Sequence, residues 1–250
     1  MRGSPPAQGV VGPLRIRGPP SQLCGESFGV LVFEHRAVLA INLRDALAFS
    51  ANTAFANLIL DDAVGTKRVV DTAHRAGVTS DIPPFPSLVL GTAEVAPLEM
   101  ADAYLSFETG GERRRTTSVL NVKDAQGRSV PVGSARRERV LTAKVSAGVD
   151  DALRAVVREG TGKAAARTDR AVAGKTGTTS NFRDAWFVGY TRGECCVIAV
   201  WVGYPEAQRA MTNVGGNGPV TGSGLPSRVF AKVLDAALGV PVLPAAPAGG

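Results

Sequence analysis

Residues 171–204 read AVAGKTGTTSNFRDAWFVGYTRGECCVIAVWVGY and decide the fold class. The segment contains three short runs rich in β-branched, aromatic and other apolar residues, at 171–178, 185–190 and 195–204, with turn residues between them. Such runs are typical of strands, and their short connections favour antiparallel pairing. Because the run from Cys196 to Val202 is apolar throughout, we expect a central strand that is covered on both sides.

The sequence around this segment predicts helices. Asn42 can cap a helix that ends near Ser50. Helical spacing of apolar residues follows over 53–60, from 66 to 77, from 97 to 110, from 149 to 160 and from 226 to 239. A turn at 124–127, between apolar runs at 116–122 and 128–132, indicates a hairpin. Helices that lead into an antiparallel sheet with a covering terminal helix predict an α+β fold.

The ends of the chain differ in composition from its middle. Gly and Pro recur through residues 1–22, and residues 240–250 are rich in Pro, Ala and Gly. Such composition favours flexible chain over regular elements. We therefore expect a flexible N-terminal segment at 1–40, one domain at 41–239 and a tail at 240–250.

Charge and composition exclude several classes of function. The net charge is +6, but the arginine clusters at 113–115 and 136–137 lack interleaved aromatic residues, so we expect a solvated basic face and no nucleic-acid partner. The 3 cysteines and 2 histidines lack metal-ligand spacing, and no cofactor motif is present, so we expect neither a metal nor a cofactor. No apolar run reaches the ~18 residues of a membrane span, and no signal peptide is evident.

The densest polar cluster on a predicted strand is Ala173 to Thr179. A phosphate-binding loop ending at Gly174-Lys175 would need glycine where Asp169 stands, and a second frame fails at Val157. The remaining interpretation is an edge strand that carries Lys175-Thr176-Gly177, a motif typical of serine acyltransferases that recognise penicillin. Ser50-Ala51-Asn52, at a helix end, stands where such enzymes carry S-x-N.

Longer stretches make the resemblance specific. The chain resembles the transpeptidase domain of class A penicillin-binding proteins over about residues 41 to 244. The matching stretches are 42–47, 83–91, 94–101, 158–162, 175–179, 184–190, 200–204 and 220–226. The resemblance implies a fold like that of β-lactamases and DD-transpeptidases, and a location in the cell envelope on the outer side of the cytoplasmic membrane.

The resemblance also implies acyl transfer in peptidoglycan cross-linking. In the family, the serine of S-x-x-K attacks the D-Ala-D-Ala bond of a stem peptide and passes the acyl group to a neighbouring amine, and β-lactams are captured at the same site. Carried over to this chain, Ser50 would relay a proton to the leaving nitrogen. Lys175 would set Ser50 and supply positive potential for the substrate carboxylate.

The same comparison assigns the substrate-binding residues. Asn52 would hold a side-chain amide of the substrate, and the hydroxyls of Thr176 and Thr178 would hydrogen-bond its carboxylate. Gly177 would let the substrate backbone approach the strand, and the backbone N–H of Thr178 would be one oxyanion donor. The partners implied are peptidoglycan stem peptides and β-lactams, bound as an added strand at the sheet edge.

The sequence departs from the family at the nucleophile. None of its serines has lysine three residues on, so S-x-x-K is absent. We therefore expect an N-terminally truncated domain that is inactive alone and that lacks an export signal or anchor. The alternative is a non-catalytic module that binds stem peptide or an envelope partner. A class A β-lactamase is disfavoured because E-x-x-L-N is absent.

Overall fold

The computed structural model describes residues 41–114, 116, 119, 122–130, 137–194, 196–216 and 218–239. The expected flexible segment at 1–40 and tail at 240–250 lie outside these residues. The helices are α1 (Leu43–Ala48), α2 (Asn52–Leu58), α3 (Thr66–Ala76), α4 (Pro97–Glu108), α5 (Ala143–Arg158) and α6 (Leu225–Ala237). The strands are β1 (Glu112–Arg114), β2 (Val122–Lys123), β3 (Ser129–Val130), β4 (Arg137–Arg139), β5 (Val172–Thr178), β6 (Asp184–Thr191) and β7 (Cys196–Gly203).

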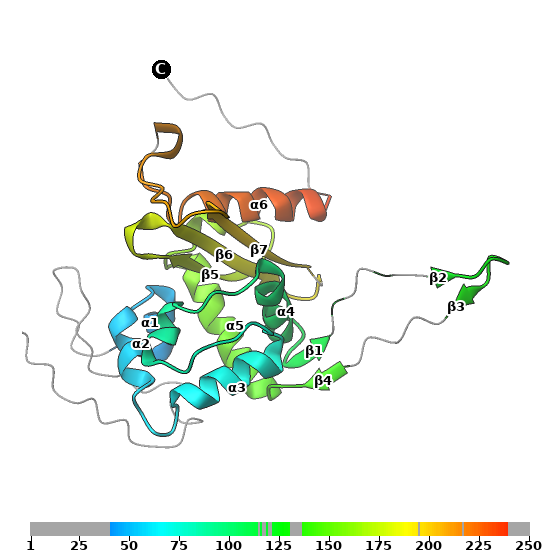
Figure 1. The fold of residues 1–250 in the computed structure, drawn as a ribbon, viewed down its shortest axis with the longest axis horizontal. Coiled ribbons are helices and arrows are strands. Elements are labelled where there is room, and N and C mark those ends of the chain that lie inside the picture. Colours follow the sequence, from blue (N-terminus) through cyan, green and yellow to red (C-terminus); the bar gives the residue numbers. More distant parts are fainter. Residues whose placement is uncertain are drawn as a thin grey trace, which may run out of the picture.

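The main sheet is antiparallel in the order β5-β6-β7. Helix α6 crosses one face, and α4 and α5 cover the other, on the side where α1, α2 and α3 also lie (Figure 1). Two small ribbons, β1 with β4 and β2 with β3, complete the described strands. The predicted α+β class and its antiparallel sheet are confirmed.

The central position expected for the last strand stays a prediction, because the sheet is described only for part of the chain. Within the described part of the chain β7 lies at one edge of the main sheet, and β6 is the central strand. Both faces of β7 are nevertheless covered, because α4 packs on one face and α6 on the other. Apolarity on both faces therefore reports the covering helices rather than strand neighbours.

Alternation along β5 divides the core into two layers. Val172 packs on the α6 side with Phe187, Phe230 and Leu234, and the Phe187 and Phe230 ring centroids are 4.7 Å apart. Ala173 faces the opposite side, with Leu153 of α5 and Tyr190 of β6. Because successive side chains alternate across a strand, Lys175 shares the side of Ala173. Thr176 and Thr178, near the end of β5, belong to neither core layer and hydrogen-bond Thr161 and Gly222 instead.

Most helices begin and end close to the residues expected, but α5, expected from 149, begins at Ala143 because Thr142 caps it. Asn42 caps α1, since its side-chain oxygen accepts a hydrogen bond from the Asp45 N–H at 2.8 Å. Gly77 ends α3 with a φ of 135°, a conformation that glycine adopts readily. The hairpin turn joins β2 and β3, although much of its flanking sequence lies outside the described residues.

Candidate active site

Ser50 lies in the turn between α1 and α2. Its φ of 55° is uncommon for a residue with a side chain, and its N–H donates to the carbonyl of Leu47 at 3.2 Å. The next N–H, that of Ala51, donates to the carbonyl of Ala46 at 2.8 Å. These bonds reverse the chain, so that Asn52 opens α2 with an exposed side chain.

Lys175 of β5 joins this turn to the sheet edge. Its Nζ donates to Ser50 Oγ at 2.9 Å and to the carbonyl of Thr176 at 3.0 Å. Burial lowers the pKa of Lys175 from 10.5 to about 8. The structure thus brings together two motifs that are 125 residues apart in sequence. Asn52 is not part of this hydrogen-bonded group among the described residues.

Both threonines of the strand have a fixed partner. The hydroxyls of Thr176 and Thr161 share a hydrogen bond of 2.7 Å. The Oγ1 of Thr178 accepts a hydrogen bond from the N–H of Gly222 at 3.0 Å. Gly177, between them, contacts the Gly222 loop so closely that a Cβ on Gly222 would lie 2.5 Å from its carbonyl oxygen.

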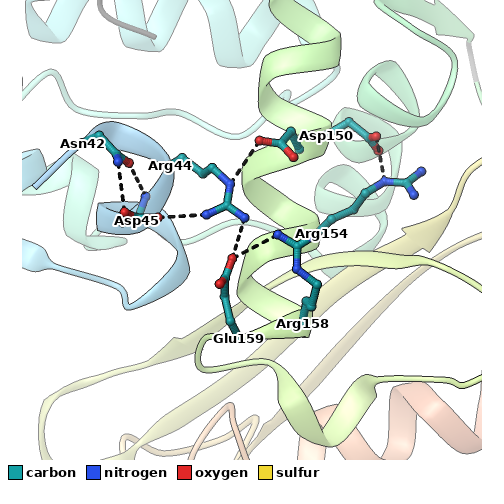
Figure 2. Close-up of polar contacts among 8 residues, drawn as sticks. Asn42, Arg44, Asp45, Asp150, Arg154, Arg158 and Glu159 are labelled. Atoms are coloured by element: carbon teal, nitrogen blue, oxygen red, sulfur yellow. Dashed lines mark hydrogen bonds and ion pairs between the residues drawn. The ribbon is translucent and has the colours of Figure 1, made fainter. Parts of the chain in front are cut away.

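An ionic network holds α1 against α5 (Figure 2). The guanidinium of Arg44 contacts Glu159 at 2.5 Å, Asp45 at 2.9 Å and Asp151 at 3.1 Å. Arg158 reaches the same oxygen of Glu159 at 3.1 Å. The hydrogen bond from Arg44, first of all, lowers the pKa of Glu159 below its ordinary value. These exposed pairs contribute little energy singly, but they fix the helix that carries the Ser50 turn.

The segment after α5 closes onto the end of α1. The N–H of Thr161 donates to the carbonyl of Ala48 at 3.1 Å. Gly160 lies so close that a Cβ there would be 2.0 Å from the same oxygen. Thr161 therefore contacts the Ser50 turn through its backbone and Thr176 through its side chain.

Sequence reasoning gave no individual role to Thr161 or Gly222. Both lie in stretches that carried the family resemblance, 158–162 and 220–226. The glycines on either side of Thr161 were the available signal, because paired glycines beside a polar residue often mark a close backbone approach.

The described residues contain no group of three or more potential metal ligands. No helix in those same ranges is long and apolar enough to cross a membrane.

Comparisons with known proteins agree with this geometry. The family model "Penicillin binding protein transpeptidase domain" matches residues 33–223. The chain is 42% identical over 164 residues to penicillin-binding protein 1A of Aquifex aeolicus, a match that covers 66% of this chain and 22% of that protein. It is 31% identical over 246 residues to penicillin-binding protein 1A of Mycolicibacterium smegmatis, covering 82% and 31%. The chain thus spans less than a third of the length of these relatives.

Solved structures give the same result. The penicillin-binding protein PonA1 of Mycobacterium tuberculosis matches with a TM-score of 0.73 and 27% identity, over 88% of this chain and 62% of that one. A structure of that protein in complex with penicillin V matches with a TM-score of 0.70 and 28% identity, over 84% and 59%. The fold, the paired motifs and the family match point the same way: the chain belongs to the penicillin-binding protein transpeptidase family and carries a transpeptidase domain of the class A type.

Proposed function

We propose that this domain serves peptidoglycan cross-linking in the cell envelope, on the outer side of the cytoplasmic membrane. Its substrates are stem peptides that end in D-Ala-D-Ala, and β-lactams bind at the same site. The observation that carries the proposal is the hydrogen bond of 2.9 Å between Lys175 Nζ and Ser50 Oγ, which joins the two family motifs at one edge of the sheet.

The edge of β5 supplies the groups that a peptide carboxylate needs. Lys175 contributes a positive charge, and the hydroxyls of Thr176 and Thr178 are hydrogen-bond donors of suitable chemistry. Among the described strands β5 is at one edge, and an extended peptide can add to its outer side as a further strand. In that position the N–H of Thr178 would donate to the carbonyl oxygen under attack, and Gly177 would admit the peptide backbone.

Proton transfer falls to Ser50 and Lys175. Because burial brings the pKa of Lys175 to about 8, the ammonium can exchange a proton with its neighbours near neutral pH. Where a serine nucleophile of the S-x-x-K type attacks the peptide carbonyl and forms the acyl bond, Ser50 would pass that proton to the nitrogen that leaves. Asn52, at the start of α2, would hold an amide of the stem peptide.

The nucleophile of the family reaction has no counterpart in the 250 residues, since none of the serines begins S-x-x-K. Removal of a serine nucleophile abolishes most of the rate, because nucleophile, base and oxyanion donors act as a unit. We therefore propose that this chain alone binds stem peptide reversibly and forms no acyl-enzyme. The missing motif favours, as a second candidate, a non-catalytic module that binds stem peptide or an envelope partner.

Two measurements on the purified chain test the proposal. A fluorescent penicillin, followed by denaturing electrophoresis and intact-mass spectrometry, should give no covalent adduct. A labelled peptide ending in D-Ala-D-Ala should bind reversibly and lose binding on Lys175→Met, whereas Lys232→Met, an exposed change on α6, should leave it unaltered. An adduct would show that the chain is acylated after all. Absence of binding, or binding indifferent to Lys175, would refute the carboxylate site.

A further inference from the structure

The hydroxyl oxygen of Thr178 already accepts a hydrogen bond from within the domain. Its Oγ1 accepts the N–H of Gly222 at 3.0 Å, and the direction of this bond is certain because a backbone N–H can only donate. A hydroxyl that accepts one hydrogen bond still carries its own proton for donation. The Gly222 loop therefore holds the Thr178 oxygen and leaves its proton for another acceptor.

Gly222 is itself held in place by α6. The hydroxyl of Ser227, in the first turn of that helix, donates to the carbonyl of Gly222 at 2.6 Å. Ser227 is fully buried, at 0% exposed. A Cβ on Gly222 would lie 2.5 Å from the carbonyl oxygens of both Gly177 and Trp186, so glycine alone fits this close against the two paired strands.

We propose that Gly222 and Ser227 are positioning residues, which orient the Thr178 hydroxyl so that it donates to the carboxylate of a bound peptide. This inference rests on the proposed function, because it requires Thr178 to face that carboxylate. Thr161 makes an analogous contact with Thr176, but either hydroxyl can donate there, so the direction is not fixed.

A purely structural role for Ser227 predicts a different outcome. Such a role would make the loop and α6 less stable on substitution, with equal effects on every ligand. An orienting role acts specifically on recognition of the carboxylate. Ser223 is a matched control, because it lies in the same loop and bonds the Thr221 hydroxyl at 3.0 Å instead of Gly222.

The first experiment needs no ligand. Scalar couplings to the Thr178 methyl group, measured by NMR on the full chain, report the χ1 rotamer. We expect one rotamer in the wild type and in Ser223→Ala, and rotamer averaging in Ser227→Ala. A single, unchanged rotamer in Ser227→Ala would overturn the inference. Should Ser227→Ala not fold, Ser227→Cys keeps the size and a weak donor, and it should show partial averaging.

The second experiment separates the inference from the proposed function. Binding is compared for a peptide ending in D-Ala-D-Ala and for the same peptide with a C-terminal amide. We expect the preference for the carboxylate form to fall by about 5- to 30-fold in Ser227→Ala and at least as far in Thr178→Val, with no change in Ser223→Ala. Loss in Thr178→Val with the preference kept in Ser227→Ala would refute only the positioning role. Lack of any preference in the wild type would refute the proposed function instead.

Discussion

Replacement of Lys175 by methionine should make the apo domain more stable at neutral pH. The ammonium is partly buried beside Ser50, and burial lowers its pKa from 10.5 to about 8. A shift of one pKa unit corresponds to about 1.4 kcal/mol, so keeping this group charged in the fold costs about 3 kcal/mol at pH 7. The variant leaves Ser50 Oγ and the Thr176 carbonyl without their hydrogen-bond donor, and this loss reduces the gain in stability by about 1 kcal/mol. We expect a net gain of about 2 kcal/mol.

The sign of the pH dependence follows from the same shift. Between about pH 8 and 10.5 the unfolded chain keeps the Lys175 proton that the folded chain has lost. The unfolded state therefore binds more protons, and the wild type gains stability relative to the variant as pH rises through this range. The advantage of Lys175→Met should therefore disappear at about pH 9.5, and by about pH 10.5 the wild type should be the more stable by about 1 kcal/mol.

Urea unfolding followed by far-UV circular dichroism measures this difference at several pH values. Subtracting the free energy of unfolding of the variant from that of the wild type cancels the pH-dependent contributions of other groups, such as Tyr190, whose pKa burial raises. Lys232→Met, on the exposed side of α6, should change stability by less than about 0.5 kcal/mol. If Lys175→Met is less stable than the wild type at pH 7, or if the difference does not shrink at alkaline pH, the reasoning is wrong.

Three further predictions concern the close packing at Gly160, the acid stability of the fold and the charge of Lys175. Gly160→Ala should destabilise the domain by about 2–4 kcal/mol in urea unfolding, because its Cβ would meet the Ala48 carbonyl at 2.0 Å. Gly127→Ala has nothing within 4 Å of its Cβ but a φ of 78°, so it should cost only the backbone strain of about 1 kcal/mol, and an equal loss in both variants would contradict the clash. Glu99 has a pKa of about 2 because Ser80 and Thr79 donate hydrogen bonds to its carboxylate. Its contribution to folding stability is therefore complete above about pH 4.5 and is lost as pH falls toward 2. In Glu99→Gln the urea midpoint should depend less on pH over this acid range. A bound D-Ala-D-Ala peptide should raise the pKa of Lys175 back toward 10.5. NMR of the Lys175 ε-methylene group measures this pKa, and an unchanged value would place the carboxylate elsewhere.

Local features of the fold could be predicted from sequence. The Asn42 cap contacts a residue three positions on, and Gly77 ends its helix through its own φ, so short-range chemistry determines both. The three strands of the main sheet were predicted from their apolar runs, and they begin and end within two residues of the expected positions. Composition alone could not distinguish a strand with two strand neighbours from one covered by α4 and α6, so the apolar run of β7 does not fix its position in the sheet.

The site could be predicted only in part, for a related reason. Family motifs indicated Ser50 and the Lys175 strand, although nothing in their spacing shows that they meet. The contacts of Thr161 with Thr176 and of Gly222 with Thr178 join residues 15 and 44 positions apart. Such contacts depend on how loops close over the finished sheet, and periodicity carries no information about that step.

Asp150 and Lys175, both next to the main sheet, have opposite surroundings. Asp150 of α5 is compensated by the Tyr190 hydroxyl at 3.0 Å, by Arg154 at 2.8 Å and by Arg192 at 3.5 Å. Lys175 forms no ion pair with any residue that the structure describes, and its hydrogen bonds go only to a hydroxyl and a carbonyl. An uncompensated buried charge reduces stability, and a buried, perturbed lysine at a sheet edge is the kind of group that binds an external anion, as the proposed function requires. Under the proposed function, the same imbalance that should make Lys175→Met more stable would attract a peptide carboxylate.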